Sequence, residues 1–145
     1  MGKDQNKPYS VSNNVALGKY GEAIAVEHLI KCGYSILAKN FRAKCGEVDI
    51  IAKKEKSLVF VEVKTRESLS YGFPEEAISK RKIGKIKSLA RLFVATNNSF
   101  SNFDIRFDLI SIVIDKTLTS FNNRGSYNRT HSLKNFEIKH IENAF

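Results

Sequence analysis

The chain has 145 residues, of which 42% are hydrophobic and 27% are charged. This length and composition are typical of one compact globular domain and exclude a largely disordered chain. No window approaches the ~18 consecutive apolar residues of a membrane span, and the N-terminus MGKDQNKPYS lacks the apolar stretch of a signal peptide. We therefore expect a cytoplasmic protein with no membrane partner.

The chain is strongly basic, with 24 Lys and Arg residues against 15 Asp and Glu residues and a formal net charge of +9. A basic surface favours polyanionic partners, because each phosphate that a protein neutralises releases condensed counterions. Small basic proteins are also common among proteins that bind no nucleic acid, so charge alone does not decide the question. We expect nucleic acid, and DNA above all, as the partner.

The cysteines and histidines indicate neither a zinc centre nor a disulfide framework. Cys32 and Cys45 are the only cysteines, and the three histidines lie scattered along the chain without zinc-type spacing. A cytosolic chain of this size gains little from one bridge and normally keeps its thiols reduced. We therefore expect neither structural zinc nor thiol chemistry.

A first helix is expected after a flexible polar tail at residues 1–12. Asn13 or Asn14 can cap its first turn, and Gly33 supplies a stop after about Lys31. One face of this helix follows the three-four spacing of a core stripe: Val15, Gly18, Glu22, Ala25 or Val26, and Leu29. Glu22 thus lies in a stripe that should face the core, where a carboxylate needs an amine, a backbone donor or a metal as its partner.

The rest of the chain predicts strands, a second helix and one long loop. Strands are expected over residues 34–41, twice within residues 46–66, over 103–114, and in FEIKHI near the C-terminus. A second helix is expected over about 76–96, and the surface beside its apolar stripe carries the basic residues Lys80, Arg81, Lys82, Lys85, Lys87 and Arg91. Residues 116–135 are expected to form a long mobile loop or a weak hairpin. We expect residues 13–145 to form a single α/β domain.

Residues 46–66, GEVDIIAKKEKSLVFVEVKTR, place charged side chains within two apolar strands. Alternation puts two sets on opposite faces of the second strand: Leu58, Phe60, Glu62 and Lys64 on one face, and Val59, Val61 and Val63 on the other. On the first strand it separates Val48, Ile50 and Ala52 from Glu47, Asp49 and Ile51. If residues 54–57 form the loop, four pairs follow: Lys53 with Leu58, Ile51 with Phe60, Asp49 with Glu62, and Glu47 with Lys64.

Asp49 opposite Glu62 is the unusual pair, because opposed like charges destabilise a sheet unless a positive charge lies between them. A divalent cation such as Mg²⁺ removes this repulsion and activates water for phosphodiester hydrolysis. Lys64, on the same face, could orient that water, and Glu22 could complete the metal shell. Glu47 stays open between a ligand and a salt-bridge partner, and a shift of one residue in register would separate the acidic pair.

The Glu-x-Lys spacing is not specific by itself. At this composition it is expected once or twice by chance, and it occurs at Glu62/Lys64 and again at Glu137/Lys139. The second instance has no acidic strand partner and suits a solvated strand face. What distinguishes the first is the opposed Asp49 and the unexplained Glu22. From the residues alone, an ordinary salt-bridged strand face remains as good an explanation as a metal site.

Several separated segments resemble the small bacterial YraN family (UPF0102): GKYGEAIAVEHLIKCGYSIL, NFRAKCGEVDIIA, LVFVEVKTR, YGFPEEAIS, RFDLISI and IENAF. The resemblance covers nearly the whole chain except the tail and residues 116–135. It places the protein with the PD-(D/E)XK nuclease-like superfamily, near the Holliday-junction resolvases. This implies a restriction-endonuclease-like αβββαβ core, in which helices flank a central mixed sheet.

The resemblance also implies the roles of individual residues. The superfamily's aspartate, glutamate and lysine fall on Asp49, Glu62 and Lys64, and the first-helix acid of the resolvase branch falls on Glu22. The motif here is D-x12-E-x-K, with Val48 where the superfamily usually has proline. We expect all four to be catalytic, with Asp49, Glu62 and Glu22 binding Mg²⁺ or, as an alternative ion, Mn²⁺.

The function expected from these observations is metal-dependent endonucleolytic hydrolysis of DNA, including branched or junction DNA. The candidate phosphate contacts are Arg42, Arg66, Lys80, Lys82 and Lys85, although a solvated basic face explains any one of them. A homodimer would suit an enzyme that makes two symmetric cuts. The alternative is a non-catalytic nucleic-acid-binding module that retains the nuclease fold. Asp108 is expected in a surface or salt-bridge role.

Overall fold

The computed structural model describes residues 10–67, 78–114 and 136–145. The chain order of the elements is α1 (Ser10–Lys31), β1 (Ser35–Ala43), β2 (Gly46–Lys54), β3 (Ser57–Arg66), α2 (Lys80–Thr96), a 3-10 turn (Asn98–Phe100), β4 (Asp104–Ile114) and β5 (Phe136–Ile141). This order confirms the expected α/β fold and is consistent with a restriction-endonuclease-like core. Residues 1–9 of the expected tail and the expected loop at 116–135 lie outside the described residues.

The two helices begin at other residues than expected. Helix α1 already starts at Ser10, so the expected tail is at least three residues shorter. Helix α2 starts at Lys80 instead of about residue 76, because Ser79 caps it: the Ser79 hydroxyl accepts a hydrogen bond from the Lys82 N–H at 3.2 Å. Among the described residues, no helix combines the length and the apolar character needed to cross a membrane.

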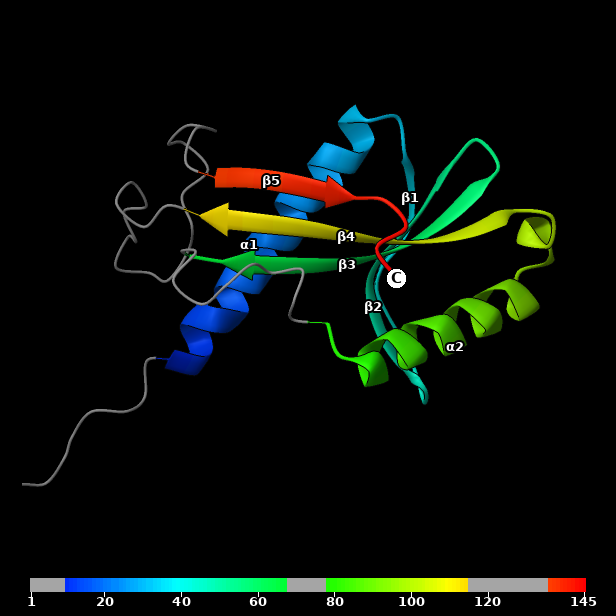
Figure 1. Cartoon of the computed structure of the whole chain (residues 1–145), viewed down its shortest axis with the longest axis horizontal. Coiled ribbons are helices and arrows are strands. Elements are labelled where there is room, and N and C mark those ends of the chain that lie inside the picture. Colours follow the sequence, from blue (N-terminus) through cyan, green and yellow to red (C-terminus); the bar gives the residue numbers. More distant parts are fainter. Residues whose placement is uncertain (1–9, 68–77, 115–135) are drawn as a thin grey trace, which may run out of the picture.

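The five strands form one mixed sheet in the order β1-β2-β3-β4-β5. Strands β3 and β4 run parallel, and every other neighbouring pair is antiparallel. A parallel pair needs a crossover connection, and α2 lies in the chain segment between β3 and β4. Figure 1 shows α1 lying across the sheet beside β3, β4 and β5, while α2 packs at the other side near β2.

Each helix covers its own hydrophobic cluster. Helix α1 packs on Ile50, Val61 and Ile112, whereas α2 packs on Ile51, Leu58 and Phe60. The strand residues alternate between the two clusters, which explains why the central strands are apolar on both faces. The sheet is therefore the middle layer of three, and both of its faces are buried along β3.

The buried face of α1 differs from the expected stripe. Its buried apolar residues are Leu17, Ile24, Ala25 and Leu29, while Val15 is 55% exposed. Gly21 is buried on this face and Glu22 is half-buried beside it. The helix is thus rotated so that Gly21 faces the sheet, and Glu22 lies at the edge of the core instead of inside it.

Gly21 allows the close approach of α1 to β3. A Cβ atom added at Gly21 would overlap the side chain of Thr65, whereas one added at Gly18 would meet no atom within 4 Å. We expect Gly21→Ala to destabilise the protein by about 1 to 3 kcal/mol, because the helix must move off the sheet. The matched Gly18→Ala change should stabilise it by about 0.5 to 1 kcal/mol, because it only favours the helix. Urea unfolding of both variants measures the contrast; equal effects would contradict the close approach.

Candidate active site

Asp49 lies where β2 separates from β3. The ladder between these strands runs from Lys54↔Ser57 to Ile50↔Val61. This confirms the predicted register, although the turn holds two residues instead of four. Beyond Ile50 the Asp49 side chain replaces the main chain as acceptor: its Oδ2 accepts a hydrogen bond of 2.7 Å from the Val63 N–H.

Two of the four predicted strand pairs are therefore wrong. The described ladder ends before Asp49 could pair with Glu62 or Glu47 with Lys64. A side chain that accepts a main-chain N–H pushes the two backbones apart, because it occupies the place of the partner carbonyl. The same divergence places Val48 in the α2-side cluster, apart from Ile50.

Glu62 is buried in a strongly cationic surrounding. The residue is only 3% exposed. Its Oε1 lies 3.4 Å from the Lys64 ammonium and 3.5 Å from the Lys82 ammonium, while its Oε2 is buried and has no hydrogen-bond partner among the described residues. A buried carboxylate oxygen without a donor is costly, so this oxygen marks a place where a cation would be stabilised.

Asp49 and Glu62 are close enough to interact although they are not opposed in the ladder. Burial, and next the negative charge of Glu62, raise the pKa of Asp49 to about 6. The Val63 N–H and the ammonium groups of Lys82 and Lys64 oppose this rise without cancelling it. The divergence of β2 thus brings the two acids together by a different route from the one that the alternation predicted.

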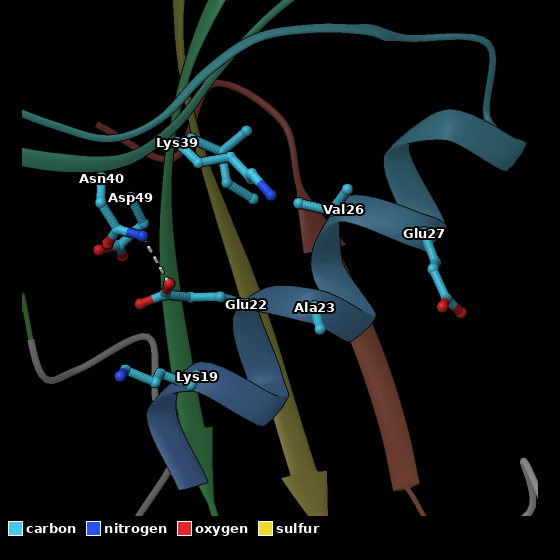
Figure 2. Close-up of a pocket in the computed structure, with 9 residues that line it drawn as sticks. Lys19, Glu22, Ala23, Val26, Glu27, Lys39, Asn40 and Asp49 are labelled. Atoms are coloured by element: carbon cyan, nitrogen blue, oxygen red, sulfur yellow. Dashed lines mark hydrogen bonds between the residues drawn. The ribbon is translucent and has the colours of Figure 1, made fainter. Parts of the chain in front are cut away.

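Glu22 reaches this region from α1. Figure 2 shows its side chain extending toward Asn40 and Asp49, while Glu27 points away from them. The Asn40 side-chain amide donates a hydrogen bond of 3.0 Å to Glu22 Oε2. Asn40 has a φ of 50°, a left-handed conformation that Asn tolerates better than most residues. Glu22 and Asp49 line one cavity of about 390 Å³, together with Lys19, Lys39 and Asn40 on its polar side.

A second cavity, the basic cavity, lies between the β1–β2 turn and α2. It measures about 330 Å³, and its charged lining residues are Arg42, Glu47, Lys82 and Lys85. The Arg42 Nε lies 3.0 Å from Glu47 Oε2, so Glu47 forms a salt bridge with Arg42. Lys80 is the first residue of α2 and Arg66 the last of β3; neither lines the two cavities.

Comparison with known proteins identifies the family. The sequence pattern of the "Uncharacterised protein family UPF0102" matches residues 21–112. The chain belongs to UPF0102. A UPF0102 protein of Clostridium botulinum (strain Kyoto) is 44% identical over 132 residues, 91% of this chain and 95% of the relative. One of Caldicellulosiruptor bescii is 50% identical over 99 residues, 68% of this chain and 83% of the relative.

The donor atoms of this UPF0102 site are of the kind that a hard divalent cation prefers, since Glu22, Asp49 and Glu62 offer carboxylate oxygens. Among the described residues these three acids do not present ligand atoms that all lie within 4.8 Å of one another, so Asp49 and Glu62 are the pair that the fold brings together. Glu62 Oε2 is the buried oxygen without a partner, and Asp49 uses Oδ2 for Val63, which leaves its Oδ1 for a ligand. Among the described residues no histidine or cysteine thiol joins these acids, which are of the kind that suits Mg²⁺ better than zinc.

The raised pKa of Asp49 predicts a pH dependence of stability. The pKa of Asp49 is about 6 in the folded protein, above the ordinary 3.8. At pH values between these two, the folded state binds more protons than the unfolded state, so stability falls as the pH rises. Compared with the Asp49→Asn variant, the metal-free wild-type protein should lose about 1 to 3 kcal/mol of unfolding free energy between about pH 4 and about pH 7. Melting both proteins with chelator across this range measures the difference, and a difference that is constant with pH would contradict the shift. Mg²⁺ should restore part of the loss at neutral pH.

A second charged group of this UPF0102 fold was not expected from the sequence. Asp108 is fully buried, so the expected surface position is wrong. The expected salt bridge is present, with Arg106. Its carboxylate accepts bonds of 2.9 Å from Arg106 and lies 2.8 Å from His140 Nε2. Asp108, His140 and Glu142 lie close enough to hold a metal, but the Arg106 guanidinium, 3.3 Å from Glu142, already supplies the positive charge there. We therefore interpret this group as structural.

Proposed function

We propose that this UPF0102 protein is a metal-dependent endonuclease that hydrolyses DNA phosphodiesters, with branched or junction DNA among its substrates. The observation that supports this most is the buried Glu62 carboxylate beside Asp49, whose Oε2 has no hydrogen-bond partner in the described part of the chain. Buried polar atoms are usually hydrogen-bonded, so a buried carboxylate oxygen without a donor favours a bound cation. The basic cavity next to these acids favours a phosphate-bearing substrate.

The roles of the acids follow from their positions. Asp49 and Glu62 would hold Mg²⁺, or Mn²⁺ in its place, and Glu22 would complete the shell from α1 while Asn40 keeps its side chain in place. A bound ion of this kind polarises a phosphodiester and lowers the pKa of a coordinated water. The Val63 N–H fixes the orientation of the Asp49 carboxylate, so Asp49 is preorganised for binding.

The basic residues would bind the phosphates of the substrate. The Lys64 side chain is one third exposed, so its ammonium can turn from Glu62 toward an incoming phosphate and offset the charge that develops there. Arg42 and Lys85 line the basic cavity and would bind neighbouring phosphates. Arg66 and Lys80 would extend this contact surface along the ends of β3 and α2. A homodimer would present two such sites for paired cuts.

The test is cleavage of a panel of linear, flapped, single-stranded and four-way junction DNAs with Mg²⁺ or Mn²⁺, comparing the wild type with Lys64→Ala. We expect the wild type to cut at least one of them, in a reaction that excess chelator stops, and Lys64→Ala to bind the same DNA without cutting it. Binding without cutting by the wild type would favour the alternative, a non-catalytic DNA-binding module. Cleavage that survives the chelator would overturn the proposed site.

A further inference from the structure

Lys82 is the residue of the site whose place the sequence does not explain. It lies in the first turn of α2, where its own N–H is bonded to the Ser79 cap. Its side chain is 26% exposed, and its ammonium lies 3.5 Å from Glu62 Oε1. A lysine that only enriches a basic helix face would point into solvent. Lys82 instead reaches back over the sheet to a buried carboxylate.

Lys82 also belongs to the basic cavity, which it lines with Lys85 and Arg42. Its ammonium therefore lies between the acids of the candidate metal site and the cavity suited to phosphates. Lys85 lines the same cavity but is exposed and makes no ion pair with Glu62 in the described part of the chain. The two lysines share one helix and one cavity and differ in their contact with the acid.

The charges and the free oxygens of the site limit how many ions it can bind. The groups that interact directly here are Asp49 and Glu62, with two negative charges, and Lys64 and Lys82, with two positive ones. One divalent ion would change their net charge from about 0 to about +2, whereas two would leave a strongly repulsive charge of about +4. The two ammonium groups lie beside Glu62 Oε1, so among the described residues Oε2 is the Glu62 oxygen that is open to an ion, and a second ion on the Oε1 side would be repelled by both lysines.

We propose that Lys82 takes the place of a second divalent cation, so that this site binds one ion and the Lys82 ammonium supplies the other positive charge facing the phosphate. This rests on the proposed nuclease function and specifies its metal content. It also explains why α2, the crossover helix between β3 and β4, carries a lysine at the turn that meets Glu62. Removal of the Lys82 charge should then open the position to a second ion.

The test is the stoichiometry of Mn²⁺ binding, measured by calorimetry and by electron paramagnetic resonance on the full chain. We expect one Mn²⁺ per chain in the wild type, two in Lys82→Glu, and one in the matched control Lys85→Glu. The neutral variant Lys82→Gln should bind the first ion about tenfold more tightly than Lys85→Gln, because it loses a nearby repulsion. Thermal melts of each variant without metal check that all are folded.

The outcomes separate this proposal from the one it rests on. Two ions in the wild type, or one ion in Lys82→Glu with the affinity of Lys85→Glu, would overturn the role of Lys82 and leave the nuclease proposal standing. No bound Mn²⁺ in any folded variant would overturn the metal site itself, and the role of Lys82 with it.

Discussion

Replacing Glu62 with Gln is expected to lower the rate of DNA cleavage by at least about 10³-fold, equivalent to about 4 kcal/mol of transition-state stabilisation. Gln keeps the shape of the buried side chain but removes the charge that a divalent ion needs. The ion pairs with Lys64 and Lys82 are lost at the same time. Those two lysines become free for phosphate, so DNA affinity should stay the same or rise.

The matched control for this prediction is Glu47→Gln. Glu47 lies on β2, two residues from Asp49, but is exposed and paired with Arg42, so cleavage should change little. Single-turnover cleavage and DNA binding in chelator separate chemistry from affinity. Glu62→Gln protein that cuts as fast as Glu47→Gln protein would show that Glu62 is not a metal ligand.

Replacing Asp108 with Ala is expected to destabilise the fold by about 3 to 5 kcal/mol, because it removes the buried carboxylate that pairs with the Arg106 guanidinium and leaves it only the more exposed Glu142. Asp108 also accepts the main-chain N–H of Asn143 at 3.1 Å, and the next residue, Ala144, donates its N–H to the Phe107 carbonyl. The C-terminal ring of Phe145 stacks on Phe107. Loss of Asp108 should therefore release the last residues from β4 as well.

The control for this variant is Asp104→Ala, an exposed acid at the start of the same strand, which should change stability by less than about 0.5 kcal/mol.

Burial raises the pKa of Asp108, but hydrogen bonds from His140 and Arg106 outweigh it, so the net shift is downward from 3.8. A lowered pKa contributes stability above the ordinary value, and this is lost as the pH falls through the lowered one. The difference in unfolding free energy between the wild type and Asp108→Ala should thus become smaller in acid. Urea unfolding measures it, and equal losses in both variants would contradict a buried network.

The local features of the candidate site could be predicted from the sequence because they depend on neighbours along the chain. The strand period of two predicts that Glu62 and Lys64 share a face. The assumed loop at residues 54–57 predicts that Lys53 pairs with Leu58 and Ile51 with Phe60, and both pairs are present although the turn is shorter. The same period could not predict where the ladder stops. That depends on the Asp49 side chain, which accepts the Val63 N–H in place of a carbonyl.

The position of Glu22 shows the limit of a helix pattern. Its spacing suggested a place within the core stripe, but the period of 3.6 defines a face only to within about one residue's rotation. The rotation of α1 is decided by Gly21, whose missing side chain lets the helix approach Thr65. Glu22 then faces the cavity that it shares with Asp49, which suits a ligand better than full burial would.

The sequence by itself determined the order of the elements, the faces of β3 and the register of the hairpin as far as Ile50, since all of these follow from local periodicity. Only the tertiary structure decided that Lys82 meets Glu62 and that Tyr34, Arg106, Asp108 and His140 form one buried network. Those contacts join residues far apart in the chain. They arise from how α2 crosses the sheet and from how β5 pairs with β4, and no local pattern encodes either.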